Sequence, residues 1–284
     1  MSTRRDFLRS IPAISTGFLL SSFGSKAMAN PSDIKKEVGI QLWTLRDNIA
    51  NDLNGTIEAL SKIGYTSIEA FGFDGNFYGK TAKEFSTFCQ NLGIRIHSTH
   101  TGITAGNASL YSEKAVEAGL EFLILPSLMG RPGDTIDDYK RLGDEMNQIG
   151  ECCNKQGIRF GYHNHGFEFK AKDGVLPYDI LLKETDPALV SFQLDIYWMK
   201  KAGQDPLHYF KEHPDRFHTW HVKDMGNDGE SCIVGNGNIN FKKLMHHAKK
   251  AGLDRIFVEQ EAYSEGSPLY CAAQSFKYIQ SHLL

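Results

Sequence analysis

The chain has 284 residues, of which 41% are hydrophobic, 11% aromatic and 23% charged, and this composition is typical of a globular protein that buries a full core. Its 31 basic and 34 acidic residues give a formal net charge of −3, which leaves no surplus of cations for a phosphate backbone and argues against nucleic acid as a partner. The five cysteines include no C-x-x-C pair, so a disulfide framework and a zinc ribbon are both poorly supported.

The first thirty residues have the order of an export signal. Arg4 and Arg5 precede an apolar run at 11–23, and Ala27-Met-Ala29 offers an A-x-A-like cleavage site. We expect residues 1–29 to be a twin-arginine signal peptide and residues 30–284 to be periplasmic or otherwise exported. The apolar run is shorter than the roughly 20 residues that a membrane-spanning helix needs, so no membrane anchor is expected after cleavage.

From residue 38 onward, short runs rich in β-branched and aromatic residues alternate with segments of helical period, which indicates repeated βα units. We expect strands at 38–45, 65–71, 94–100, 122–127, 158–165, 190–198, 219–223 and 255–261. We expect helices after them at 53–62, 82–91, 109–118, 136–156, 178–184, 206–212, 241–250 and 269–282. Eight units of this kind predict an α/β protein with a single (β/α)₈ TIM barrel domain. An open doubly wound sheet is disfavoured, because no G-x-G-x-x-G turn follows the first strand.

The active site of such a barrel forms at the carboxyl ends of its strands. Side chains that can bind a metal end each of the last four strands: His163, Asp195, His221 and Glu259. Since side chains alternate along a strand, all four can point toward the barrel axis, and His165 shares the face of His163. Imidazole and carboxylate ligands without a thiolate favour one divalent ion, Mn²⁺, Zn²⁺, Co²⁺ or Fe²⁺, over Ca²⁺ or a structural zinc.

Four segments carry a resemblance to a known family: Gly161-Tyr-His-Asn-His165, Gln193-Leu-Asp195, His221-Val-Lys-Asp224 and Phe257-Val-Glu-Gln260. They resemble the xylose isomerase-like TIM barrels, also called the sugar phosphate isomerase/epimerase superfamily, over about residues 36–284. The resemblance implies one divalent metal held by Glu, Asp, His and Glu at the ends of strands five to eight. Asp195, His221 and Glu259 match this set. Strand five departs from it, since His163, or else His165 or Glu168, stands where ketose epimerases have glutamate.

The resemblance implies an enzyme that removes the proton next to the carbonyl group of a small carbohydrate. Glu259 or a strand-five histidine, His163 above all, is the expected base, since both can titrate near neutral pH. Lys223 is expected to stabilise a developing oxyanion or to donate to a hydroxyl group. Further substrate contacts are expected from Glu69, His100, His165, Glu168 and Trp198.

The outcome of the reaction stays open at this point. Reprotonation of the enolate would give an isomerase or epimerase, which is our first interpretation. Loss of a β-oxygen would give a lyase or dehydratase acting on a 3-keto-glycoside or an inosose-like substrate. A non-catalytic sugar-binding barrel is a further alternative, and the sequence permits a homo-oligomer. A repair nuclease like endonuclease IV is disfavoured by the acidic charge and the export signal.

Overall fold

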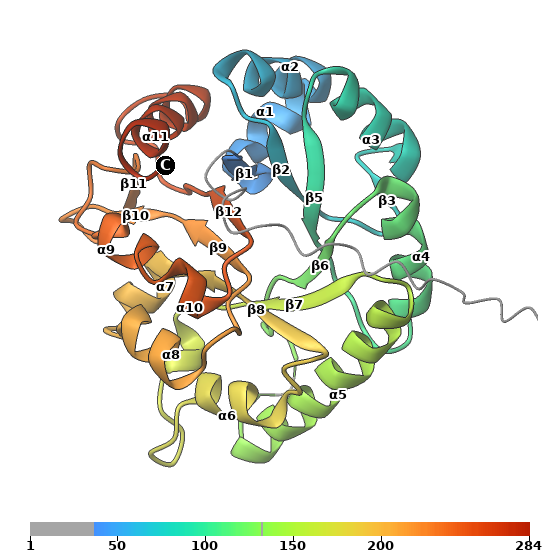
Figure 1. Ribbon diagram of the computed structural model, residues 1–284, viewed down its shortest axis with the longest axis vertical. Coiled ribbons are helices and arrows are strands. Elements are labelled where there is room, and N and C mark those ends of the chain that lie inside the picture. Colours follow the sequence, from blue (N-terminus) through green and yellow to red (C-terminus); the bar gives the residue numbers. More distant parts are fainter. Residues whose placement is uncertain (1–36, 132) are drawn as a thin grey trace, which may run out of the picture.

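The computed structural model describes residues 37–131 and 133–284, which form a closed barrel of eight parallel strands. The strand order around the barrel is β1 (Gly39–Gln41), β12 (Arg255–Val258), β9 (Thr219–Val222), β8 (Val190–Asp195), β7 (Arg159–His163), β6 (Phe122–Leu125), β5 (Arg95–His100) and β2 (Ser67–Phe71). Figure 1 shows these strands as a ring with the helices outside it. The expected (β/α)₈ barrel is confirmed, and the expected signal peptide at 1–29 lies outside the described residues.

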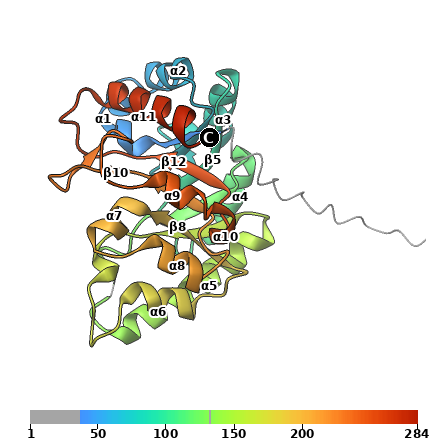
Figure 2. The same ribbon diagram turned by 60° about the vertical axis from the view of Figure 1, so that its left-hand side comes forward.

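The outer layer consists of helices that follow the strands in chain order (Figure 2). They are α1 (Arg46–Asn51), α2 (Leu53–Ile63), α3 (Ala82–Asn91), α4 (Ala108–Ala118), α5 (Ile136–Lys155), α6 (Pro177–Glu184), α7 (Ile196–Lys201), α8 (Pro206–Glu212), α9 (Phe241–Met245), α10 (Ala248–Ala251) and α11 (Pro268–His282). The single helix expected at 241–250 is therefore two short helices. Capping boxes at Thr81 and Thr135 start α3 and α5, because each hydroxyl accepts a backbone N–H that the first turn leaves free.

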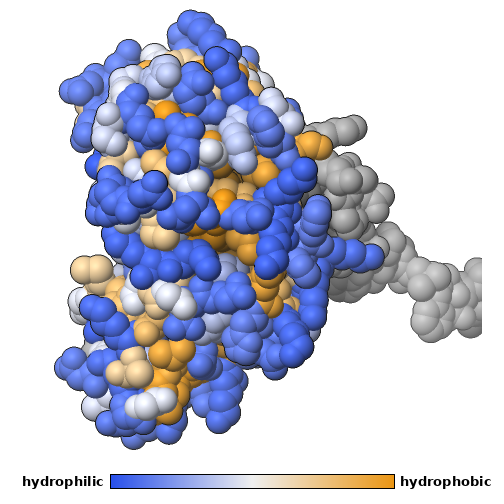
Figure 3. Space-filling view, turned by 90° about the vertical axis from the view of Figure 1, so that its left-hand side faces the viewer, coloured by the Kyte–Doolittle hydropathy of each residue, from blue (hydrophilic) through white to orange (hydrophobic). Residues whose placement is uncertain are grey.

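The strands are buried almost throughout, as parallel strands covered by helices must be. Every residue of β6, β7 and β9 except Arg159 is buried, and the core continues into the inner faces of the helices. On the face shown in Figure 3, hydrophilic side chains dominate, with hydrophobic patches between them. Among the described residues, no helix is both long enough and apolar enough to span a bilayer.

Short additional elements lie in the loops at the carboxyl ends of the strands. Two hairpins are formed by β3 (Asn76–Phe77) with β4 (Lys80–Thr81), and by β10 (Asp224–Met225) with β11 (Ser231–Cys232). Two 3₁₀ helices, η2 (Leu42–Leu45) and η3 (Phe167–Phe169), follow β1 and β7. The sequence predicts strand through residue 45, where the structure has η2.

Several strands end earlier than expected, and at the ends of β1 and β8 the reason is a polar side chain that caps a helix. Gln41 Oε1 accepts the N–H of Trp43, which ends β1 and begins η2. Asp195 Oδ1 accepts the N–H of Trp198, which ends β8 and begins α7. A side-chain acceptor for a free N–H favours a helix start over continued strand. The aromatic residues after Asp195 therefore belong to a helix above the barrel.

Candidate active site

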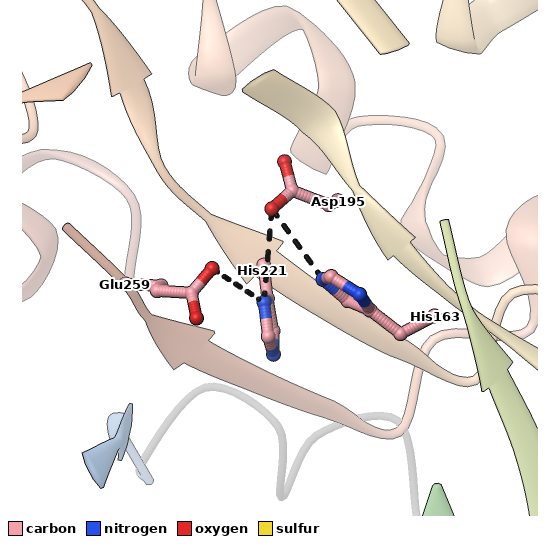
Figure 4. Close-up of side chains that lie close together, drawn as sticks. All are labelled: His163, Asp195, His221 and Glu259. Carbon is pink, nitrogen blue, oxygen red and sulfur yellow. Dashed lines mark hydrogen bonds and ion pairs between the residues drawn. The ribbon is translucent and has the colours of Figure 1, made fainter. Parts of the chain in front are cut away.

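Four side chains meet above the carboxyl ends of four neighbouring strands, β7, β8, β9 and β12 (Figure 4). They form the four-residue cluster His163, Asp195, His221 and Glu259, whose ligand-type atoms all lie within 4.8 Å of one another. The strand register explains the meeting, since Asp195 pairs with His221 and Val222 pairs with Val258, the residue before Glu259. The cluster is the set that the sequence predicts, with His163 as its member from strand five.

The distances within the cluster leave room for a shared ligand. Asp195 Oδ2 lies 3.5 Å from His163 Nε2 and 3.8 Å from His221 Nδ1. His221 Nδ1 lies 3.1 Å from Glu259 Oε2. All four residues are buried, with at most 3% of their surface exposed. Two of the atoms, His163 Nε2 and Asp195 Oδ2, have no hydrogen-bond partner among the described residues.

Contacts outside the cluster decide which atoms face its centre. His163 Nδ1 lies 3.0 Å from the carbonyl oxygen of Pro126. Burial lowers the pKa of His163, so we assign a neutral ring that donates its Nδ1 proton to Pro126 and directs the Nε2 lone pair at Asp195. Asp195 Oδ1 is occupied by the cap of α7, which leaves Oδ2 free. Two buried acceptors that face each other are costly unless a cation lies between them.

The buried carboxylate of Glu69 contacts the ring of His221 on the side away from the other cluster residues. His221 Nε2 lies 2.6 Å from Glu69 Oε1, which leaves Nδ1 facing Glu259 and Asp195. Burial alone would lower the pKa of His221, but Glu259, Asp195 and Glu69 raise it well above 6.5. A carboxylate behind a histidine is the arrangement that orients histidine ligands in metalloproteins. The donor set and its orphaned atoms therefore fit a divalent cation.

Glu69 is enclosed by donors from across the barrel. Oε1 accepts hydrogen bonds from Gln41 Nε2 at 2.7 Å and from His221, and it lies 3.2 Å from His100 Nε2. Oε2 accepts from Ser98 Oγ at 2.5 Å and from Gln193 Nε2 at 2.7 Å. Burial alone would raise the pKa of Glu69, but the rings of His100 and His221 hold it well below its usual range. This arrangement argues against the expected contact of Glu69 with substrate, because its oxygens are taken by protein donors.

Lys223 also differs from its expected position. The side chain is completely buried, and its ammonium lies 2.7 Å from Glu261 Oε1, 3.3 Å from Glu259 Oε2 and 3.6 Å from Asp195 Oδ2. Burial alone would lower the pKa of Lys223, but the three carboxylates raise it well above its usual range. The ammonium therefore offsets part of the negative charge around the cluster and contacts Glu259. The expected action of Lys223 on a substrate oxyanion stays a prediction.

A cavity of about 410 Å³ opens above the cluster. His163 and Glu259 line it, whereas Asp195 and His221 are completely buried. Its remaining polar and aromatic lining comes from Trp43, Phe71, His100, Ser127, His165 and Glu261. A cavity of this size is in the range of small-molecule sites. His100 and His165 thus lie where the sequence predicts substrate contacts.

Glu259 is ionised in this environment. Burial alone would raise its pKa, but Lys223 and His221 hold the pKa of Glu259 well below its usual range. The pKa of His163 is also lowered. The sequence led us to expect a base that titrates near neutral pH, whereas burial lowers the pKa of His163 and charged neighbours lower the pKa of Glu259, through contacts that the sequence does not reveal.

Glu168 lies beneath the cavity and is completely buried. It accepts hydrogen bonds from the Tyr162 hydroxyl and from the backbone N–H of His165. It therefore supports the loop that carries His165, and the expected contact of Glu168 with substrate is not favoured. Burial raises the pKa of Glu168 from 4.5 to about 7.

This pKa predicts a pH-dependent stability. A carboxyl group whose pKa is higher in the folded than in the unfolded chain stabilises the fold at low pH, and that stability is lost as the pH rises from about 4.5 to about 7. We expect the free energy of unfolding to fall by ~3 kcal/mol over this pH range. The fall should be absent in the Glu168→Gln variant. Urea unfolding between about pH 5 and about pH 8 measures it. Equal pH slopes for the two proteins would contradict the assignment.

Several residues around the site were not assigned from the sequence. Gln41 and Ser98 hold Glu69, the Pro126 carbonyl orients His163, and Glu261 pairs with Lys223. Gln193 was within reach of sequence reasoning, because it lies two residues before Asp195 on the same face of β8. The others depend on contacts between distant strands.

The fold agrees with comparisons to known proteins. A family model for the xylose isomerase-like TIM barrel matches residues 57–282. The chain belongs to this family. The resemblance inferred from the motifs is thereby confirmed, and the four-residue cluster is part of a xylose isomerase-like barrel.

Relatives within the family carry two kinds of names. The inosose dehydratase of Bacillus licheniformis is 26% identical to this chain over 226 residues, 72% of this chain and 71% of that protein. The inosose dehydratase of Lacticaseibacillus casei is 26% identical over 53% of this chain, and the match spans 57% of that protein. A solved sugar phosphate isomerase/epimerase from Parabacteroides distasonis is 28% identical with a TM-score of 0.78, covering 89% of this chain and 96% of that chain.

Proposed function

We propose that this protein is a divalent-metal-dependent enzyme that removes the proton next to the carbonyl group of a keto-sugar or keto-cyclitol. The observation that carries the proposal is a pair of buried atoms, His163 Nε2 and Asp195 Oδ2, that lie 3.5 Å apart without a hydrogen-bond partner in the part of the chain that the structure describes. They lie beside Glu259, a carboxylate that lines a cavity. A cation of the Mn²⁺, Zn²⁺, Co²⁺ or Fe²⁺ class, held by the four-residue cluster, would supply Lewis acidity to the substrate carbonyl.

Glu259 is the proposed base. It is the carboxylate of the cluster that lines the cavity, and it is ionised at neutral pH, so it can accept a proton from carbon. Lys223 and His221 contact Glu259 Oε2 and fix the direction of the carboxylate. His163 lies on the other side of Asp195 from Glu259 (Figure 4), and its neutral ring lines the same cavity. His100 and His165 line the same cavity and are proposed to bind the hydroxyl groups of the substrate.

Elimination of a β-oxygen is the outcome that we favour over epimerisation. Epimerisation needs an acid–base group on each face of the carbon, and here one carboxylate of the cluster faces the cavity while Asp195 is completely buried. Elimination needs one base for the C–H proton and a route for the departing oxygen. The inosose dehydratases among the relatives support a dehydratase or lyase of this kind. Twin-arginine export, which the sequence predicts, favours a substrate without a phosphate group.

Proton exchange tests the proposal. The protein, stripped with a chelator and reloaded with Mn²⁺, Zn²⁺ or Co²⁺, is incubated in D₂O with an inosose and with a 3-keto-glycoside, and NMR follows the substrate. We expect deuterium at the carbon next to the carbonyl group, followed by an unsaturated product, and at least a hundredfold slower exchange by the stripped protein. Epimer formation without elimination would support the isomerase/epimerase alternative. Sugar binding without exchange under every metal condition would overturn the proposal in favour of a binding protein.

A further inference from the structure

A second cavity of about 490 Å³ lies next to the first, and His165 lines both of them. Its other walls come from Phe167 and Phe169 of η3 and from Trp198 of α7. Lys170 and Lys201 stand at its edge and are exposed. A cavity of this volume is as large as many complete small-molecule sites. The proposed reaction at the cluster does not by itself require it.

The walls of this second cavity are suited to a hydroxylated ring. The rings of His165 and Phe167 are stacked with centroids 5.9 Å apart, and those of His165 and Trp198 lie 5.7 Å apart. Such faces pack against the C–H face of a saturated ring. Trp198 Nε1 and His165 Nδ1 are buried polar atoms without a partner among the described residues. Both atoms are covered by protein, so a ligand in this cavity would contact the aromatic faces of His165, Phe167 and Trp198.

The position of the second cavity beside the four-residue cluster indicates which part of a substrate it would bind. Trp198 lies in the first turn of α7, three residues after Asp195, and its backbone N–H donates to the Asp195 carboxylate. Lys223, which holds Glu259, lies 5.2 Å from the Trp198 ring centroid. The aromatic wall is therefore built onto the residues of the cluster. A substrate whose keto ring occupies the first cavity can continue past His165 into the second.

We propose that the second cavity binds the leaving sugar ring of a keto-glycoside, so that the substrate consists of two linked rings. This inference rests on the proposed function. In the reaction, the base takes the proton next to the carbonyl group, and the C–H electron pair forms the new C=C bond. The C–O bond to the second ring breaks, and its electron pair leaves with the oxygen, which takes up a proton. The products are an unsaturated keto-sugar and a free sugar, so neither water nor an oxidant is consumed.

The test compares two substrates that share one keto ring, a 3-keto-disaccharide and the corresponding methyl 3-keto-glycoside. For the metal-loaded wild-type protein, we expect kcat/KM to be at least tenfold higher for the disaccharide, because the second ring contributes binding that the methyl group cannot. Trp198→Ala and Phe167→Ala should each lower this ratio about tenfold. Trp43→Ala, which removes an aromatic wall of the first cavity, should change both substrates together and leave the ratio within about twofold.

The outcomes separate the two proposals. If the methyl glycoside is turned over and the ratio stays near one, or if neither Trp198→Ala nor Phe167→Ala lowers it, the second cavity is not a subsite and the proposed function stands. Turnover of neither substrate by the metal-loaded protein would overturn this inference. Deuterium exchange into an inosose under the same conditions would leave the proposed function standing, and its absence there as well would remove both. Because the ratio is measured within one variant, a general loss of folded protein cancels from it.

Discussion

Replacing Glu259 with glutamine is expected to slow deuterium incorporation into the substrate by about 10³-fold or more, since a positioned base contributes on this order and the amide cannot accept the proton. The amide keeps the size of the side chain and an oxygen atom that can face the cluster. NMR of the metal-loaded variant in D₂O measures the exchange. Metal content, determined on the same sample, shows whether the loss comes from the base or from the binding of the cation.

Glu261→Gln is the matched control for this variant. Glu261 also lines the first cavity and also contacts Lys223, but it is not a member of the four-residue cluster. We expect its loss to slow exchange by less than about tenfold, because Lys223 keeps Glu259 and Asp195 as partners. Full exchange by metal-loaded Glu259→Gln would eliminate Glu259 as the base. A larger loss in Glu261→Gln than in Glu259→Gln would move the base to Glu261.

Replacing Glu69 with glutamine is expected to destabilise the metal-free protein by about 2–5 kcal/mol and to weaken divalent-metal binding roughly 10–100-fold. The new amide group would present N–H donors to Gln41 or Gln193, which themselves donate to Glu69. At the same time His221 would lose the carboxylate that orients it. Urea unfolding gives the free energy of unfolding, and competition with a chelator gives the metal affinity.

Ser98→Ala provides the graded control for Glu69. It removes one hydrogen bond to Oε2 and leaves the charge and the contact with His221 in place. We expect a loss of about 1 kcal/mol in stability and a change in metal affinity below about threefold. If Glu69→Gln binds metal as tightly as the wild-type protein, the role of Glu69 in orienting His221 is wrong, whatever its effect on stability.

The architecture of the barrel followed from patterns that are local in the sequence. Apolar alternation and helical periods located each of the eight βα units, since both depend on neighbouring residues. The predicted ends of β1 and β8 were too late in the sequence, because the residues after each strand have strand-like composition. Asp195 is a favoured helix N-cap residue, yet the run Ile196-Tyr-Trp198 has the composition of a strand. Only the hydrogen bond from Trp198 to Asp195 decides between the two.

The sequence by itself determined the barrel and the four residues of the cluster, because the carboxyl ends of parallel strands must converge at one face and their polar residues with them. The tertiary structure alone decided what each side chain does there. Glu69 and His221 are 152 residues apart in the chain but 2.6 Å apart in space, and Lys223 reaches carboxylates from two other strands. Such contacts fix tautomers, charges and accessibility, and they depend on which side chains meet across the barrel rather than on any property of one strand.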